Sequence, residues 1–181
     1  MRYNKFMEGK NLNLKPQDVI VILKVLSKGK VPWRISDLAY ELDLSAGEVS
    51  NCLGRLKACA LISNDKKTPM VTNLKEFLLY GLRYTFPARL GKNERGVLTA
   101  HSFGPISKKI VSDVNYVWPF PDGEVKGVSV SPLFKNAPKA SLNDEKLHQF
   151  LALIDSVRIG KVREKKLAME ALEKELSSYE L

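Results

Sequence analysis

One stretch of the chain, residues 35–56, constrains the possible fold more than any other. Apolar residues recur at helical spacing in each of its halves, which predicts two helices. Between the halves, Ser45 is followed three residues later by Glu48. This is a capping box, in which each side chain satisfies a free backbone N–H at the start of a helix. Asp43 supplies the turn, since aspartate tolerates left-handed backbone geometry. The apolar positions are Leu38, Ala39, Leu42, Val49, Leu53 and Leu56.

The two predicted helices also meet the packing requirements of a helix-turn-helix. Ala39 is small enough for the helices to cross closely, Leu44 fills the turn, and Val49 faces back onto the first helix. Upstream, Pro16 suits the first turn of a helix and Gly29 suits its end, so a third helix is predicted between them.

Two short apolar segments within residues 62–71 flank a turn with Lys66 and Lys67 at its tip, which predicts a small β-ribbon. Residues 15–85 as a whole resemble the winged helix-turn-helix of MarR-like transcription regulators, in which such a ribbon is the wing. That family usually has glycine where this chain has Asp43. The resemblance implies a homodimeric regulator that binds double-stranded DNA, with its two recognition helices about 34 Å apart in successive major grooves.

The recognition helix of such a regulator would present small and polar residues to the DNA. Ala46 and Gly47 allow the helix to approach base edges closely. Asn51 is suited to pairing with adenine, and Ser50 to contacting a base or a phosphate. Basic residues around the helix are expected to hold phosphates and so fix the protein on the duplex. These residues are Arg34, Arg55, Lys57, Lys66 and Lys67.

The charge distribution agrees with a polyanionic partner for the N-terminal part. The chain has a net charge of +9, and residues 1–85 contribute +6 of it, from 14 basic and 8 acidic side chains. A basic surface attracts nucleic acid through its summed field and through counterion release. Charge alone is equally typical of an ordinary solvated surface, so it supports DNA binding only together with the helix-turn-helix.

The rest of the chain predicts an α+β fold with three parts. Residues 1–86 are the winged helix domain, residues 87–140 a partly β connector or subdomain, and residues 141–181 a helical region. Six of the nine prolines lie in the middle part, whose expected strands are Val97–Thr99 and Glu124–Val130, with a turn over Trp118–Gly123. In the last part, we expect one helix from Ser141, with Asp144 in its capping box, to Gly160, and a second helix after it.

Four short motifs in residues 84–176 carry a second resemblance. They are Tyr84–Ala88, Arg95–Val97, Val117–Pro119 and Leu151–Asp155, and they resemble a group of bacterial MarR-annotated regulators. Members of that group are often encoded beside a nucleotidyltransferase-type toxin, which implies an autorepressor or antitoxin. Winged helices also serve as protein-contact modules, so the competing hypothesis is an antitoxin that neutralises a partner enzyme through its C-terminal region.

Other classes of protein find little support in the sequence. No phosphate-cradling glycine loop, nucleophile elbow or paired metal-ligand motif occurs, so we expect no enzyme, cofactor or metal. The sequence contains no run of eighteen apolar residues, so no membrane helix is predicted. The first residues lack the apolar segment of a secretory signal, so we expect the protein in the cytoplasm. Cys52 and Cys59 are too far apart along one helix for a disulfide. His101 and His148 are interpreted as surface or core residues.

Overall fold

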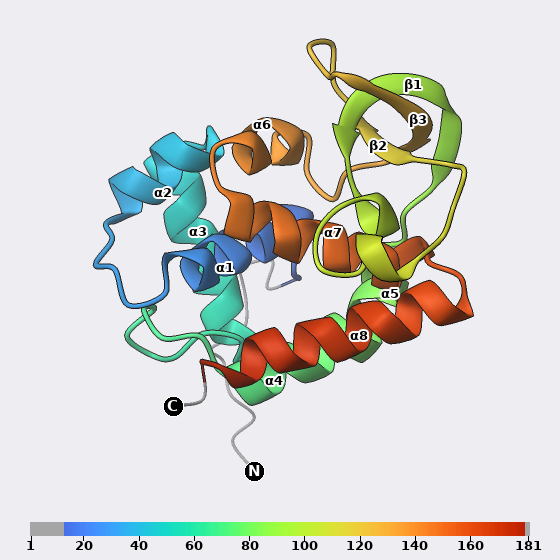
Figure 1. Ribbon diagram of the computed structural model, residues 1–181. Helices are drawn as coiled ribbons and strands as arrows, with labels where there is room; N and C mark the ends of the chain where they lie inside the picture. The colour runs from blue at the N-terminus through green and yellow to red at the C-terminus, as the bar shows by residue number, and fades with distance from the viewer. Residues whose placement is uncertain (1–12, 180–181) are drawn as a thin grey trace.

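Helix α7 (Glu145–Ile159) lies at the centre of a mixed α+β fold, which the computed structural model describes over residues 13–179 (Figure 1). Its side chains from Leu147 to Arg158 are all buried except for the half-buried Gln149. A helix that is buried on nearly every side must be covered by neighbours in all directions. Here one N-terminal helix, the helix before the β unit, the two other C-terminal helices and the helical turn that follows the first strand surround it.

The three N-terminal helices begin and end close to where the sequence predicts. Helix α1 spans Pro16–Lys28 and stops at Gly29, which has a positive φ of 57°. Helix α2 spans Ile35–Leu42 and helix α3 spans Ala46–Ala58. Every residue of α1 from Asp18 to Leu26 is buried, because α2 and α3 cover one side of the helix and α7 covers another.

The segment after α3 has less strand pairing than the expected ribbon. A single β-bridge joins Ile62 and Pro69, and the return strand expected to include Val71 is absent because Val71 begins a helix. That helix runs continuously through α4 (Val71–Glu76), a π-helical turn η1 (Phe77–Gly81) and α5 (Leu82–Thr85). The expectation of two paired strands over residues 62–71 was therefore wrong in extent, although the hairpin turn itself is present.

Three strands form the β unit: β1 (Leu90–Leu98), β2 (Tyr116–Pro119) and β3 (Val125–Val130). Strand β1 pairs antiparallel with both of the others, and β2 pairs parallel with β3, so the strands close on one another. The predicted strand at 124–130 is confirmed as β3, whereas Trp118 lies in β2 and not in the expected turn. Two short helical turns, η2 (Ala100–Ser102) and η3 (Ser107–Lys109), connect β1 to β2.

Glycines allow three strands to close so tightly. A Cβ atom added at Gly96 would lie 1.9 Å from the backbone oxygen of Trp118. One added at Gly127 would lie 2.4 Å from the backbone oxygen of Asn115. Neither distance is possible for a real side chain, so backbone contact at these two points requires glycine.

The C-terminal region contains three helices where two were expected. Helix α6 (Ala137–Leu142) ends before Asp144, whose side chain accepts a hydrogen bond of 2.9 Å from the backbone N–H of Leu147. Asp144 is thus the N-cap of α7 and not the third residue of a helix that begins at Ser141. The predicted stop at Gly160 is confirmed, and α8 (Val162–Ser177) follows it.

Residues of three of the four short motifs meet in one buried polar network. Asp155 Oδ2 accepts hydrogen bonds from Thr99 Oγ1 at 2.9 Å and from Trp118 Nε1 at 2.6 Å. Asp155 Oδ1 accepts one of 2.6 Å from Arg158, which also donates to the backbone oxygen of Phe86. Burial raises the pKa of Asp155, and the Arg158 charge opposes that rise. The network joins the β unit and the end of α5 to α7, which gives these motif residues a structural role.

A single hydrophobic core extends from α1 to α8 and includes buried side chains from all three predicted segments. Within the described residues, no helix is long and apolar enough to cross a membrane.

Candidate nucleic-acid interface

The turn between α2 and α3 has the backbone geometry that its sequence predicts. Asp43 lies in the left-handed region, with φ 54° and ψ 49°, so aspartate occupies the position for which glycine is the usual choice. The next residue, Leu44, is half-buried, and its backbone N–H donates a 2.9 Å hydrogen bond to the oxygen of Ala39. The two helices are therefore joined by a short, hydrogen-bonded turn.

The predicted capping box at the start of α3 is confirmed. The backbone N–H of Glu48 donates to Ser45 Oγ at 3.1 Å, and the backbone N–H of Ser45 donates to Glu48 Oε2 at 3.2 Å. This reciprocal pair holds the Glu48 carboxylate at the helix N-terminus. Its negative charge there is stabilised by the helix dipole and is engaged locally.

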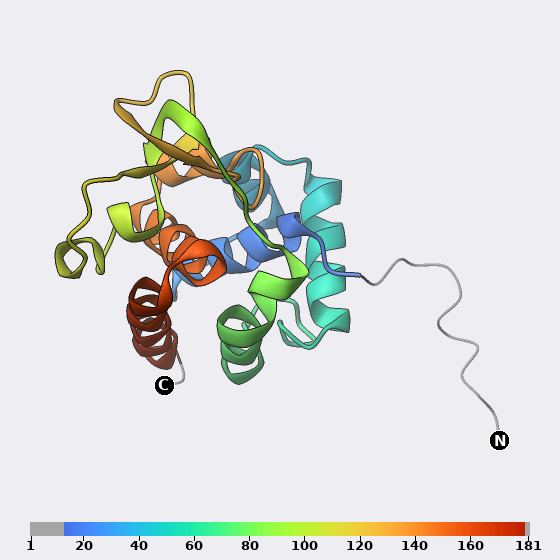
Figure 2. The ribbon, with the colours of Figure 1, turned by 90° about the vertical axis from the view of Figure 1, so that its right-hand side faces the viewer.

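The outer face of α3 is exposed along its whole length. Ala46, Gly47, Ser50, Asn51 and Lys57 are all exposed, and the helix lies along one side of the molecule (Figure 2). Among the described residues, the side chains of Ser50 and Asn51 have no hydrogen-bond partner. We call this surface the α3 outer face. It offers an amide and a hydroxyl that are not used by the fold.

Arg55 lies elsewhere, and its expected phosphate contact needs correction. Its guanidinium donates to both carboxylate oxygens of Asp18, at 2.7–3.1 Å, and its side chain is only 16% exposed. Asp18 itself is completely buried in α1, and the pKa of Arg55 is raised mainly by this hydrogen bond. This pair joins α3 to α1. Breaking it would leave the buried Asp18 carboxylate without a compensating charge, so Arg55 is not available to a phosphate.

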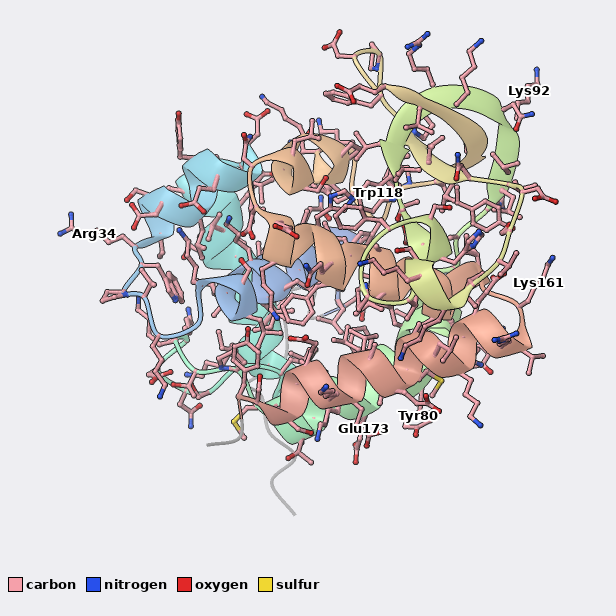
Figure 3. The ribbon with its side chains drawn as sticks, viewed as in Figure 1. Arg34, Tyr80, Lys92, Trp118, Lys161 and Glu173 are labelled. Carbon is pink, nitrogen blue, oxygen red and sulfur yellow. The ribbon has the colours of Figure 1, made fainter. Side chains whose placement is uncertain are left out.

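The remaining predicted cations lie near one end of the interface. Arg34 is exposed and extends away from the body of the protein, as its label in Figure 3 shows. Lys66, at the hairpin tip, has a left-handed backbone with φ 58° and is half-buried. Lys67 is exposed, but its ammonium donates to the backbone oxygen of Trp33 at 2.9 Å and lies 3.8 Å from the centre of that indole ring. Lys67 thus holds the hairpin against the segment before α2.

Residues at the start of α6 reach the turn between α2 and α3, a feature that the sequence analysis missed. Asn136 donates to the backbone oxygen of Asp43 at 3.0 Å, and Lys139 forms an ion pair of 3.1 Å with the Asp43 carboxylate. A cavity of about 560 Å³ lies between α2 and α6 beside this contact. No local pattern predicts such pairs, because their partners are more than 90 residues apart.

A second polar cluster ties α1 to α2 and α7. The Lys24 ammonium, which is 5% exposed as a residue, lies 2.6 Å from both Glu41 Oε2 and Asp144 Oδ2. Ser27 Oγ also donates to Asp144 at 2.6 Å. Burial acts to raise the pKa of Asp144 and of Glu41, but the hydrogen bonds from Lys24 and the other donors outweigh it and lower both.

The cysteines and histidines have structural surroundings. Neither Cys52 nor Cys59 forms a disulfide within the described residues; Cys52 is buried and Cys59 half-buried. Burial, with Asp18 beside it, raises the pKa of Cys52 to about 12, so the thiol stays protonated. His101 and His148 are both buried, and burial lowers the pKa of His148. In the part of the chain that the structure describes, no cluster of three or more metal-ligating side chains occurs.

The chain was compared with known proteins at three levels. It matches no protein-family model, no curated protein and no solved structure.

Proposed function

We propose that the chain is a sequence-specific, dimeric DNA-binding regulator, in which α1–α3 and the hairpin after them act as a winged helix-turn-helix. The observation that carries the proposal is the α3 outer face. Its amide and hydroxyl are exposed and have no partner within the described residues, and the helix begins with small residues that permit close approach to base edges. An α-helix of this kind fits the major groove, where base edges present a distinct pattern for each base pair.

Each remaining side chain of the interface has a separate expected role. The Asn51 amide would make two hydrogen bonds to an adenine, and Ser50 would contact a neighbouring base or phosphate. Lys57, Arg34 and Lys66 would hold phosphates on either side of the groove. Arg55 leaves this set because it is paired with Asp18. These three cations all come from residues 1–85, which carry +6 of the net charge.

Substitution of Asn51 by alanine tests base reading. With the DNA upstream of the protein's own gene as probe, Asn51→Ala should lose discrimination at one base pair, at a cost of about 1–3 kcal/mol. The variant should keep its binding to non-specific DNA, because its phosphate contacts are unchanged. Binding isotherms on the native sequence and on single-base variants measure the difference. Equal discrimination by wild type and variant would show that Asn51 does not read a base.

Substitution of Lys66 by alanine tests the phosphate contact at the hairpin. Lys66→Ala should weaken binding to all sequences alike and reduce the slope of log K against log salt by about 1. Lys92→Ala is the matched control, because Lys92 lies on β1, away from this interface (Figure 3). An unchanged slope for Lys66→Ala, or an equal change for the control, would contradict the assignment.

A second candidate function is inhibition of a partner enzyme, such as a nucleotidyltransferase-type toxin, through the C-terminal region. Exposed basic residues at the start of α8, namely Lys161 at its N-cap, Arg163 and Lys166, favour it. The test measures the activity of the purified neighbouring enzyme with and without an equimolar amount of the full chain. Inhibition supports an antitoxin role, and unchanged activity together with intact DNA binding supports the regulator alone.

A further inference from the structure

A second surface feature lies away from the α3 outer face, between α5 with its π-helical turn and α8. It is a groove of about 560 Å³, and we call it the α5–α8 groove. Figure 3 shows Tyr80 and Glu173 on the same lower side of the molecule. The side chains that matter here are Tyr80 and Arg83 on one wall, and Val162, Lys166, Met169 and Glu173 on the other.

The groove exposes large apolar side chains. Tyr80 is 65% exposed and Val162 is 89% exposed, while the half-buried Met169 lies between the walls. Tyr84, one turn after Tyr80, is also exposed. Single exposed apolar residues are ordinary, but several along one groove are characteristic of a surface that contacts another molecule.

One wall of the groove has unusual backbone geometry. Leu79 and Tyr80 belong to η1, a π-helical turn of five residues between α4 and α5. Such turns are rare, and they occur frequently at functional sites. This turn offsets the helix register by a fraction of a turn, and Tyr80, which belongs to it, lines the groove. The backbone therefore provides a second observation that marks the same surface.

The charged residues on the α8 wall of the groove differ in sign along its length, with lysines near the start of the helix and glutamates further along. Lys161, Lys165 and Lys166 lie at the N-terminal end of the groove, and Glu170 and Glu173 lie further along the helix. None of these side chains forms an ion pair within residues 13–179. Lys166 and Glu173 are separated by about 10 Å along the helix axis, which is too far for them to pair with each other.

We propose that the α5–α8 groove is the interface of the dimer, and that its occupant is the same groove of a second copy with α8 antiparallel to α8. A two-fold interface must be complementary to itself. In the antiparallel arrangement, Lys166 of each copy meets Glu173 of the other, so the two pairs form together. A purely acidic or purely basic partner would satisfy one end of the groove and be repelled by the other, which favours a second copy.

The position of the groove also suits a dimer that binds DNA. Figure 2 shows α8 along one side of the molecule and α3 along the opposite side. Association through the groove therefore leaves the α3 outer face of both copies uncovered. The inference rests on the proposed dimeric regulator and adds the surface through which the copies associate.

Charge reversal and mixing test this interface without DNA. Lys166→Glu and Glu173→Lys should each place like charges opposite one another at two points of the dimer. The dissociation constant should rise at least about tenfold in each case, since like-charge contacts cost several kcal/mol. An equimolar mixture of the two variants should dimerise again, because in the mixed dimer each reversed residue faces an opposite charge. Sedimentation velocity over a range of concentrations measures the dissociation constant of each variant and of their mixture.

Two controls separate the interface from other effects. Lys92→Glu makes the same charge change on the β unit and should leave the dissociation constant unaltered. Thermal melting followed by circular dichroism should show that both α8 variants remain folded. The inference is overturned if the wild type is monomeric, if single reversals leave the dimer intact, or if the mixture fails to dimerise.

The experiment also distinguishes the interface from DNA binding itself. A duplex with one half-site should bind the monomeric Lys166→Glu variant as tightly as it binds a wild-type subunit. If the half-site duplex is bound but the two variants fail to dimerise when mixed, the proposed interface is wrong and the DNA-binding proposal stands. The result for Asn51→Ala does not depend on the mixing test. Conversely, a successful mixing test with no DNA binding by the wild type would sink the regulator and retain the interface.

Discussion

At the residue scale, two glycines should respond in opposite ways to the same substitution. Gly96→Ala places a Cβ atom 1.9 Å from the backbone oxygen of Trp118, so β1 and β2 must separate. We expect a loss of about 1–3 kcal/mol in the free energy of unfolding, the usual cost of overpacking. Gly54 lies within α3 with no atom near its absent side chain, so Gly54→Ala should stabilise the protein by up to about 1 kcal/mol.

Urea unfolding of both variants under one set of conditions measures the two changes. The pair is its own control, because each variant adds one methyl group to the protein. If both substitutions were neutral, or if Gly96→Ala were the more stable variant, the close approach of β1 to β2 would not be a feature of the folded protein.

The helix termini show which residue roles can be predicted from sequence. Ser45 with Glu48, and Asp43 with its left-handed backbone, act within a few residues of themselves, so the sequence predicts both correctly. Arg55 differs, because helical spacing places it near the outer face of α3 while its partner Asp18 lies 37 residues away. The spacing of residues along one helix contains no information about a charge on another helix. The sequence analysis therefore predicted a phosphate contact for Arg55.

At the scale of elements, the attachment of α7 to α1 should depend on pH. Asp144 has a lowered pKa, held down by Lys24 and Ser27 against the effect of burial. A carboxylate with a lowered folded-state pKa stabilises the protein above its unfolded pKa of about 3.9, and that contribution is lost as the pH falls through the folded value. Asp144→Asn keeps the N-cap of α7, because asparagine caps as well as aspartate does.

Asp144→Asn should therefore cost about 1.5–3 kcal/mol at pH 7, the range for hydrogen bonds to charged groups. The cost should shrink on acidification, as the pH falls through the folded pKa of Asp144 and the wild-type carboxyl becomes protonated as well. Glu145→Gln, the exposed neighbour on the same helix, is the matched control and should change stability little. Urea unfolding curves at several pH values measure the difference, and parallel pH profiles for wild type and Asp144→Asn would contradict the proposed attachment.

The elements themselves differ in how far sequence predicts them. Helices α1, α3 and α8 have apolar faces at helical spacing and clear ends, and they lie where expected. Strand β1 was predicted only in its last residues, because Leu90 to Arg95 are all exposed and show no alternation of apolar and polar positions. Strand β2 contains two of the residues that suggested a turn, and its pairing with β1 and β3 depends on contacts distant in sequence.

At the scale of the whole molecule, one hydrophobic core joins the three predicted segments, so we expect that the N-terminal part does not fold as an independent domain. Helix α1 is buried from Asp18 to Leu26, and α7 supplies one side of its cover. Without α7, the side of α1 that α7 covers would be exposed to water. The sequence boundaries near 86 and 140 therefore mark changes of secondary structure, and we expect one cooperative unfolding transition for the chain.

Truncation at residue 140 should consequently abolish the fold of what remains. Helix α7 contributes six large apolar side chains to the core, each worth about 1.5–3 kcal/mol when fully buried. Their combined loss is comparable to the 5–15 kcal/mol that stabilises a typical domain. The truncation would also remove Asp144, one of the two carboxylates that pair with the buried Lys24. These six side chains are those of Leu147, Phe150, Leu151, Leu153, Ile154 and Val157.

The fragment 1–140 should lack a cooperative thermal transition and be degraded by protease under conditions in which the full chain is resistant. It should also fail to bind DNA, even if the α3 outer face reads DNA in the full chain, because α3 packs on α1 and the truncation removes α7, which covers another side of α1. Full-length Asn51→Ala is the control, since it should lose base discrimination and keep the cooperative transition. A fragment that melts cooperatively and binds the upstream DNA like the full chain would show that the N-terminal helices form a domain of their own.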